Sequence, residues 1–390
     1  MIHGDTTIVY GWIGQNTKTM KRIGITGQAG FVGTHLFNLL KTKNDVVAIP
    51  FEDTYFEKQA LLVEFVKQCD VIVHLAAVNR CSSQEELYET NIRLVNQLIE
   101  AMQTANVSPH VIFSSSTQEE RDNLYGKSKR EGREKLSGWA ESNNALFTGL
   151  VIPNVYGAFG MPFYNSVVAT FCYQLTHGEQ PKIDVDGSLK LIYVGELTEQ
   201  IYQIAVSGKS QKELLLPYTA KKKVSELLTL LETYKAQYFE QGIIPALPSA
   251  FEINLFNTFR CYIDIQSHFP VLLKKNEDER GIFVETIKLH SGGQISFSTT
   301  KPTITRGNHY HTRKIERFVV LQGEARIQLR KTGTNKVLNF TISGDNPSYI
   351  DMPIWYTHNI TNVGKTELIT QFWINEIFDP NDSDTYFEVV

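Results

Sequence analysis

Short apolar runs alternate with amphipathic segments through the first 250 or so residues of the chain. The apolar runs end in turn residues, as buried strands do, and the segments between them carry apolar positions at helical spacing. This alternation is typical of a parallel, doubly wound sheet of the Rossmann type, with helices on both faces. Strands are predicted at residues 23–26, 46–49, 71–75, 110–113 and 191–194, and helices at 32–40, 87–102 and 224–239.

The pattern changes near residue 276. Short β-rich runs then follow one another, separated by turn residues, and helical periodicity is nearly absent. Such a series favours an antiparallel barrel or jelly roll. The predicted strands cover residues 281–285, 294–298, 317–321, 325–329 and 368–373.

These two patterns divide the chain into a first domain at residues 20–255 and a second at 256–390, with a connecting segment at 251–275. A strand–helix unit begins at Met20, so residues 1–19 are predicted to be an extension. The length of 390 residues agrees with two domains rather than one.

Composition narrows the function classes. The net charge of −4 carries no basic excess, so no nucleic-acid partner is expected. No run of 18 apolar residues occurs, and no membrane span is predicted. The four cysteines form no CxxC pair, which predicts reduced thiols in a cytoplasmic protein.

Three glycines mark the turn between the first strand and the first helix. Gly27 permits the tight turn, Gly30 lets the backbone approach a pyrophosphate, and Gly33 allows close helix–strand packing. Three glycines also occur in ordinary turns that bind nothing, but their position between a strand and a helix of a βαβ unit favours a dinucleotide site. The second strand runs into Glu52 and Asp53. Acidic residues there favour NAD over a 2′-phosphate, unless they are only solvated loop charges.

Tyr125 and Lys129 lie four residues apart, on one face of a predicted helix. A nearby ammonium favours the phenolate, so Lys129 is expected to lower the pKa of Tyr125 toward acid–base work. Residues 114–116 are serines at the end of a predicted strand, where a hydroxyl can bind a carbonyl. The Tyr–Lys spacing alone occurs by chance; together with the glycine turn and the serines it is a strong signal.

In this order, the motifs resemble the extended short-chain dehydrogenase/reductase family over roughly residues 20–250, with residues 74–77 and 153–157 also in place. The resemblance implies that Tyr125 protonates the nascent alkoxide, Lys129 positions the nicotinamide ribose and Ser116 polarises the carbonyl. The cofactor-binding residues that it implies are Gly27, Gly30, Phe31, Val32, Gly33, Leu75, Ala76, Tyr125 and Lys129.

One departure from that family is the short connection between Ser116 and Tyr125, which has only eight residues and leaves the shape of the substrate pocket open. His74 is interpreted as a core residue at a strand end. Asn154 either binds substrate or turns the chain.

A second group of candidate residues lies in the β-rich half. His309 and His311 point to the same face if they lie on one strand, because side chains alternate with period two. With Glu316, and His358 from a neighbouring strand, they are able to close around Zn²⁺ or another divalent metal. The alternative is a set of histidines hydrogen-bonded in a barrel without metal.

This second motif resembles the two-part motif of cupins. Residues 279–285, 294–298 and 306–309 also resemble the cupin 3,5-epimerases that act on dTDP-4-keto-6-deoxyhexoses. That likeness implies that His309 is a general base rather than a ligand. The C3 proton beside a 4-ketone is acidic, so a base removes it and the other face is reprotonated. Tyr356 either returns the proton or packs in the core.

The two domains in this order resemble bacterial capsule enzymes of the CapF and WbjC kind, from Met20 onward, with further likeness at residues 163–173 and 378–387. The resemblance implies a homodimer that acts on UDP-2-acetamido-2,6-dideoxyhexos-4-ulose, on the route to UDP-N-acetyl-L-fucosamine. It implies C3 epimerisation in the cupin domain and then NADPH-dependent C4 reduction to the L-talose-type product. Asn165 is assigned to substrate, and NADH is the alternative cofactor because of Glu52.

Two other functions stay open at this point. One is a sugar-nucleotide reductase whose cupin domain is purely structural. The other is a non-catalytic nucleotide-sensing protein, which the intact pair of Tyr125 and Lys129 disfavours.

Overall fold

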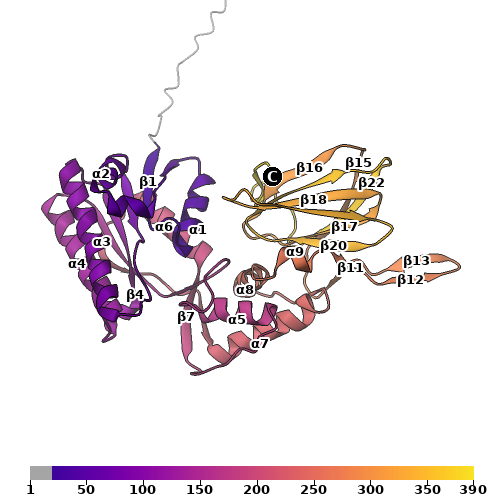
Figure 1. Ribbon diagram of the computed structural model, residues 1–390, viewed down its shortest axis with the longest axis horizontal. Helices are drawn as coiled ribbons and strands as arrows, with labels where there is room; N and C mark the ends of the chain where they lie inside the picture. The colour runs from indigo at the N-terminus through magenta and orange to yellow at the C-terminus, as the bar shows by residue number, and fades with distance from the viewer. Residues whose placement is uncertain (1–19) are drawn as a thin grey trace, which may run out of the picture.

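The computed structural model describes residues 20–390, and the extension predicted at residues 1–19 lies outside the described residues. An α/β part with a parallel sheet is followed by an all-β part of antiparallel sheets (Figure 1). The predicted fold class is therefore confirmed. Within residues 20–390, no helix is both long and apolar enough to cross a membrane.

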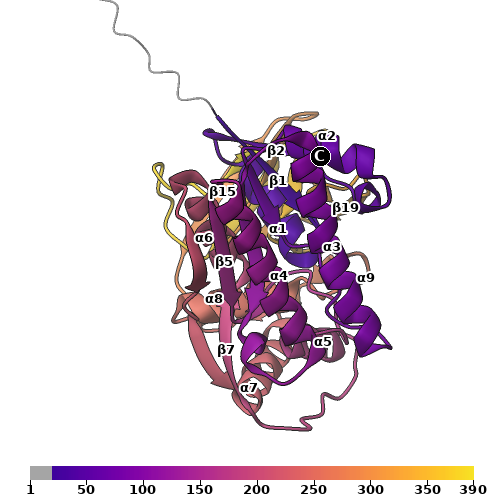
Figure 2. The same cartoon turned by 90° about the vertical axis from the view of Figure 1, so that its left-hand side faces the viewer.

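The central sheet has six parallel strands in the order β2-β1-β3-β4-β5-β8. Helices α1 and α6 pack on one face, while α2, α3 and α4 cover the other, where α3 and α4 lie side by side (Figure 2). The strands are β1 (Lys21–Thr26), β2 (Val46–Ile49), β3 (Val71–His74), β4 (His110–Ser116), β5 (Phe147–Ile152) and β8 (Gln211–Leu215), and the helices are α1 (Phe31–Lys41), α2 (Gln59–Lys67), α3 (Gln84–Ala105), α4 (Leu124–Ser142) and α6 (Val194–Ser207), with the short turns η1 (Asp53–Glu57) and η2 (Thr117–Glu120).

A smaller sheet of three strands lies beside the central one. It pairs β7 with β6 in parallel and with β9 in antiparallel, so the strand predicted at 191–194 does not belong to the central sheet. Helices α5, α7 and α8 pack around a separate apolar core there. The elements are β6 (Asn154–Tyr156), β7 (Ser188–Tyr193), β9 (Ala220–Lys223), α5 (Val167–Thr176), α7 (Val224–Tyr234), η3 (Lys235–Phe239) and α8 (Ala250–Arg260).

The all-β part consists of two five-stranded sheets, with the orders β11-β20-β17-β22-β15 and β19-β18-β21-β16-β23. Strands β15 to β22 pass between the two sheets in the order of a jelly roll. Their inward apolar side chains form one core. The strands are β11 (Val271–Leu272), β15 (Gln294–Thr300), β16 (Thr305–Tyr310), β17 (Glu316–Gln322), β18 (Glu324–Lys331), β19 (Val337–Ser343), β20 (Ser348–Met352), β21 (Tyr356–Asn362), β22 (Leu368–Ile374) and β23 (Tyr386–Phe387).

The strand predicted at 281–285 is not part of the jelly roll. It corresponds to β13 (Gly281–Val284), which pairs only with β12 (Lys275–Asp278) and forms a ribbon that projects from the body (Figure 1). Its side chains are exposed, so its apolar composition does not reflect burial in the core. A short parallel pair, β10 (Ile243–Ile244) with β14 (Lys288–Leu289), joins the base of the ribbon to the α/β part.

The segment 251–275, predicted as a connection, is largely helical. It holds most of α8 and all of α9 (Ile265–His268). Phe256 and Phe259 of α8 are fully buried in the core of the smaller lobe, which is the three-stranded sheet with α5, α7 and α8. Trp373 of β22 belongs to the same cluster. The proposed boundary at residue 255 therefore falls inside a packed helix.

A buried ion pair lies where the two parts meet. Arg317 of β17 donates from Nε and Nη2 to Asp351 of β20 at 2.7 and 2.9 Å, and each residue is 1% exposed. Tyr238 donates to the same carboxylate at 2.8 Å, and Arg260 donates to the Tyr238 hydroxyl at 3.3 Å. The jelly roll thus supplies the ion pair, and the smaller lobe supplies the groups that complete its hydrogen bonds.

We expect Arg317→Met to destabilise the protein strongly, because it leaves the Asp351 carboxylate buried without its counter-charge. Breaking such a pair costs about 3–5 kcal/mol of unfolding free energy. Urea denaturation followed by tryptophan fluorescence measures the loss. The matched control is Arg280→Met, which removes an ion pair with Asp278 on the exposed ribbon. Equal midpoints for the two variants would contradict the prediction.

Candidate active site and metal centre

A cavity of about 1160 Å³ opens at the carboxyl ends of β1, β3 and β4. This is the edge at which doubly wound sheets bind nucleotides. The cavity brings together the glycine-turn residues and the others that the resemblance assigned to cofactor or substrate, together with the three residues assigned to carbonyl chemistry. These are Gly27, Gly30, Phe31, Val32, Gly33, Leu75, Ala76, Ser116, Tyr125, Lys129, Asn154 and Asn165.

The glycine turn has the geometry that a phosphate loop needs. Gly27 has φ +69°, and a Cβ there would lie 2.8 Å from the backbone of Ala76. A Cβ on Gly33 would lie 2.2 Å from the Gly27 carbonyl oxygen, so α1 packs against the turn only because this position is glycine. The first turn of α1 lines the cavity and directs its free N–H groups there.

Charged residues of η1 and α3 line one part of the same cavity. Asp53 is among the lining residues, whereas Glu52 is exposed and is not. Arg93 of α3 also lines this part, and the sequence reading missed it. An acidic and a basic side chain therefore both reach the cavity, and the geometry does not select between a ribose hydroxyl and a 2′-phosphate.

Tyr125 and Lys129 lie in the first turns of α4, which Asn123 caps by accepting from the Gly126 N–H at 2.7 Å. Lys129 is 4% exposed, and its Nζ donates to the Ser114 carbonyl at 3.0 Å, 5.8 Å from the centre of the Tyr125 ring. The expected lowering of the Tyr125 pKa is wrong for this structure: burial raises that pKa to about 12. Burial also lowers the pKa of Lys129 to about 8, which weakens its influence.

The serines at the end of β4 differ in what their hydroxyls contact. Ser115 is buried and its hydroxyl donates to the carboxylate of Glu119. Ser116 accepts from the Gln118 N–H at 3.2 Å, so its own O–H is left to donate into the cavity. Ser116 is therefore the better placed donor. His74 is buried, 2.6 Å from the Thr26 hydroxyl, and does not line the cavity, as a core residue should.

The four residues predicted as metal ligands converge inside the jelly roll. His309 lies on β16, one residue before its end, His311 directly follows that strand, Glu316 begins β17 and His358 lies on β21. One ligand atom from each lies within 4.8 Å of the others.

The nitrogens in this cluster are arranged as ligands rather than as hydrogen-bond partners. Nε2 of His311 and Nε2 of His358 each lie 3.1 Å from Oε2 of Glu316, yet all three atoms lack a hydrogen-bond partner among the described residues. Each Nδ1 is occupied, by the carbonyl of Asp384 for His311 and by that of Tyr356 for His358. Two imidazole nitrogens and one carboxylate oxygen, close together and without other partners, are a ligand set that suits a divalent cation.

Electrostatics within the cluster point the same way. Burial disfavours the charge on Glu316, but the adjacent imidazoles outweigh it and hold the pKa of Glu316 well below its usual range. Burial also disfavours protonation of His311, and contact with Glu316 more than compensates, so the pKa of His311 is raised. The carboxylate thus needs a cation beside it, which is either a proton on an imidazole or a metal ion that replaces it.

His309 differs from the other two histidines because it is only half-buried. Burial and the neighbouring imidazoles of His358 and His311 lower its pKa to about 4, so it is neutral at physiological pH. A neutral imidazole is suited to bind a metal or to accept a proton, and the geometry is compatible with both. The Tyr356 hydroxyl keeps its proton, because burial raises its pKa to about 12, and its ring lies 6.4 Å from that of Phe159.

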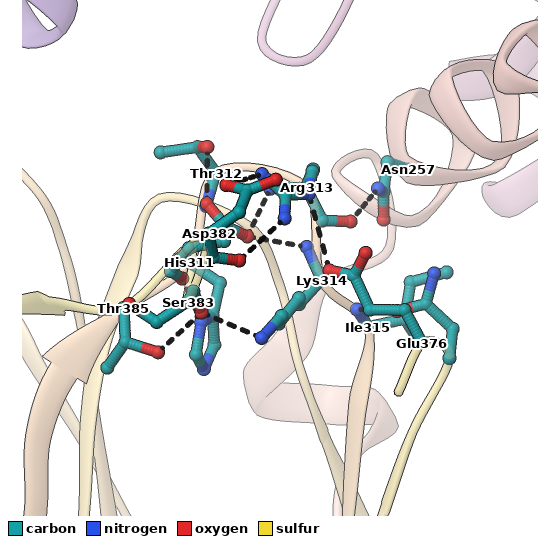
Figure 3. Close-up of polar contacts among 12 residues, drawn as sticks. Asn257, His311, Thr312, Arg313, Lys314, Ile315, Glu376, Asp382, Ser383 and Thr385 are labelled. Atoms are coloured by element: carbon teal, nitrogen blue, oxygen red, sulfur yellow. Dashed lines mark hydrogen bonds and ion pairs between the residues drawn. The ribbon is translucent and has the colours of Figure 1, made fainter. Parts of the chain in front are cut away.

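A residue that the sequence reading missed orients the cluster. The Asp384 side chain accepts hydrogen bonds from the backbone N–H groups of Thr312, Arg313 and Lys314, at 3.0, 3.0 and 2.9 Å. Its carbonyl oxygen lies 2.5 Å from Nδ1 of His311. Figure 3 shows this loop, with the tail from Asp382 to Thr385 folded against residues 311–315. Asp384 thereby fixes both the loop and the tautomer of His311.

Comparison with known proteins gives the family. Residues 23–214 match the NAD dependent epimerase/dehydratase family, and residues 276–386 match the polysaccharide biosynthesis C-terminal domain. The crystal structure of the capsular polysaccharide assembling protein CapF from Staphylococcus aureus is 32% identical and covers 95% of this chain and 100% of its own, with a TM-score of 0.59. The chain belongs to the CapF family.

Another relative extends over nearly the same length. The UDP-2-acetamido-2,6-beta-L-arabino-hexul-4-ose reductase of Pseudomonas aeruginosa is 31% identical over 367 residues, which are 94% of this chain and 98% of that protein. The UDP-N-acetylglucosamine 4-epimerase of Methanobrevibacter ruminantium, at 18% identity and a TM-score of 0.52, shares the fold of the α/β part only, covering 63% of this chain.

We expect Asp384→Asn to weaken metal binding about 10- to 100-fold, the usual effect of losing a partner that orients a ligand. The asparagine side chain replaces one carboxylate oxygen with an NH₂ group, which cannot accept the hydrogen bonds of the loop N–H groups. Competition of Zn²⁺ with a chromophoric chelator gives the affinity. Asp382→Asn is the matched control, since it alters an exposed pair with Arg313 in the same tail. Unchanged affinity in the Asp384 variant would show that the loop holds His311 without it.

Proposed function

We propose that this protein is a bifunctional epimerase and reductase of a UDP-linked 4-keto-6-deoxy amino sugar, UDP-2-acetamido-2,6-dideoxyhexos-4-ulose, in capsule polysaccharide biosynthesis. C3 epimerisation takes place in the jelly roll and C4 reduction in the α/β cavity, giving the L-talose-type product. The observation that carries the proposal is the presence of two separate sets of reactive side chains, Ser116–Tyr125–Lys129 and His309–Glu316 with their neighbours, in one chain of this family. Both steps use the same 4-ketone.

In the reduction step, the glycine turn would hold NADPH, which would supply the hydride. Ser116 donates a hydrogen bond to the ketone oxygen, and Tyr125 delivers a proton to the alkoxide that forms. The high pKa of Tyr125 suits this role, because the phenol holds its proton at neutral pH until a stronger base appears beside it. Lys129, fixed by the Ser114 carbonyl, would hold the ribose of the cofactor.

In the epimerisation step, His309 takes the C3 proton that the neighbouring ketone acidifies, and a proton then returns to C3 on the opposite face of the enolate. The low pKa of His309 keeps it neutral and ready to accept the C3 proton. His311, Glu316 and His358 would hold Zn²⁺ or another divalent metal, whose charge would favour the enolate. A nitrogen of His309 that binds the metal is not free to act as the base, so the ligand and base roles exclude each other at that atom.

The remaining parts of the proposal follow the family resemblance. We propose NADPH rather than NADH, with Arg93 available to a 2′-phosphate and Asp53 to a ribose hydroxyl. A homodimer and a cytoplasmic location also stay predictions. Steady-state kinetics with each cofactor, and sedimentation of the full chain, test the first two.

We expect single substitutions to separate the two activities. With the 4-keto sugar nucleotide and NADPH in D₂O, Tyr125→Phe should lose reduction by at least about 100-fold, the scale of a lost acid–base group, and keep deuterium exchange at C3. His309→Ala should lose deuterium exchange at C3. It should still reduce a ketone that is supplied already epimerised. NMR of the products reads both outcomes. Exchange that survives in His309→Ala would contradict the epimerase assignment. If the protein does not oxidise NADPH with any keto sugar, the alternative of a non-catalytic nucleotide sensor is favoured instead.

Metal removal should distinguish a catalytic from a structural jelly roll. We expect dialysis against a chelator to abolish C3 exchange, to spare reduction of the epimerised ketone, and to be reversed by Zn²⁺. A change of melting temperature with no change of exchange would favour the purely structural role. The zinc content of His309→Ala then separates the two roles of His309. It should fall if His309 is a metal ligand and stay unchanged if His309 is only the base.

A further inference from the structure

The jelly roll contributes to the wall of the cavity in the α/β part. Lys331 and Thr332, at the end of β18, line it together with Trp355, from the turn before β21. These residues lie roughly 200 positions or more beyond Tyr125 and Lys129, which line the same cavity. The nucleotide-binding cavity is therefore incomplete without the second part of the chain.

These three residues are held firmly in place. The Thr332 N–H donates to the Trp355 carbonyl at 2.9 Å, and the Trp355 N–H donates to the His311 carbonyl at 2.8 Å. The indole stacks on Tyr310 at 5.6 Å and meets His35 of α1 edge-on at 6.2 Å. Trp355 has φ +60°, a strained conformation for a bulky residue, which the surrounding contacts must enforce.

Lys331 carries a charge that nothing in the described residues neutralises. Its side chain is half-buried, and no carboxylate of residues 20–390 lies within 4.0 Å of its Nζ. Its Nζ lies over the face of Phe159, 3.6 Å from the ring centre. Burial lowers the pKa of this ammonium. A half-buried cation over an aromatic face, directed at a cavity, is suited to bind an anion.

Other cations that line the cavity are engaged or placed elsewhere. Lys129 donates to the Ser114 carbonyl, and Arg93 lies on α3, in the α/β part, where it donates to Gln97. The phosphates of a dinucleotide and of a UDP-sugar need more positive charge than the first turn of α1 supplies. Lys331 is the cation that the jelly roll adds.

We propose that Lys331 binds a phosphate group of a nucleotide in this cavity, so that the jelly roll completes the nucleotide site of the α/β part. The inference rests on the proposed function in that it takes the cavity to hold a nucleotide. It assigns the site a residue outside the glycine turn and the Tyr–Lys pair. The phosphate belongs either to the dinucleotide or to the UDP-sugar, and the experiment separates the two.

The test is calorimetric titration of the full-length protein with NADPH and, separately, with UDP. We expect Lys331→Met to weaken one of the two about 10- to 100-fold, the value of a charge-assisted hydrogen bond, and Lys331→Arg to stay within a few-fold of the unmodified protein. Lys336→Met is the matched control, because Lys336 is an exposed lysine in the turn that follows β18. Its affinities should not change. Lys331→Gln replaces the methionine variant if that does not fold.

Each outcome has a distinct meaning. Weaker NADPH binding assigns Lys331 to the dinucleotide, and weaker UDP binding assigns it to the sugar nucleotide. Affinities of Lys331→Met that equal those of Lys336→Met for both nucleotides overturn the inference, even if the melting temperature falls, because Lys331 then only packs on Phe159. If the unmodified protein binds neither nucleotide, the proposed function fails as well.

Discussion

The buried pair of Arg317 and Asp351 is the constraint on which the arrangement of the molecule depends. Two charges that are each 1% exposed are tolerated only when every hydrogen bond is satisfied, and here Tyr238 and the Gly242 carbonyl from the smaller lobe satisfy them. The pair therefore fixes the jelly roll against the α/β part. Because side chains alternate along β17, Glu316 points to the interior cluster while its neighbour Arg317 points to the joint.

The two candidate sites are distinct but share a supporting loop. None of the four cluster residues lines the nucleotide cavity, yet Trp355 lines that cavity and donates from its backbone to the His311 carbonyl. The same turn thus forms part of the wall of the first site and contacts a candidate ligand of the second. Through this turn and the carbonyl of Asp384, His311 is held from two sides, so the two candidate sites are structurally connected.

Local spacing predicted much of both sites. The helix that carries Tyr125 and Lys129, the glycine turn and the histidine pair all depend on residues close in sequence, and the structure brings each set together. Contacts across long separations were not predictable, which is why Arg93, Lys331 and Asp384 were missed. The strand predicted at 281–285 forms as β13 but lies outside the jelly roll, because an exposed apolar strand has the same sequence pattern as a buried one. The pKa of Tyr125 depends on burial, which spacing does not report.

The position of α8 has a consequence for recombination between genes of this family. Its phenylalanines belong to the core of the smaller lobe, while the Asn257 side chain donates to the Arg313 carbonyl at the edge of the histidine cluster. A crossover within this helix would pair half of one protein's core with another protein's cluster. Chimeras should therefore inherit α5, β7, α7, α8 and the jelly roll from one parent, so the unit of exchange differs from the two domains that the sequence pattern suggests.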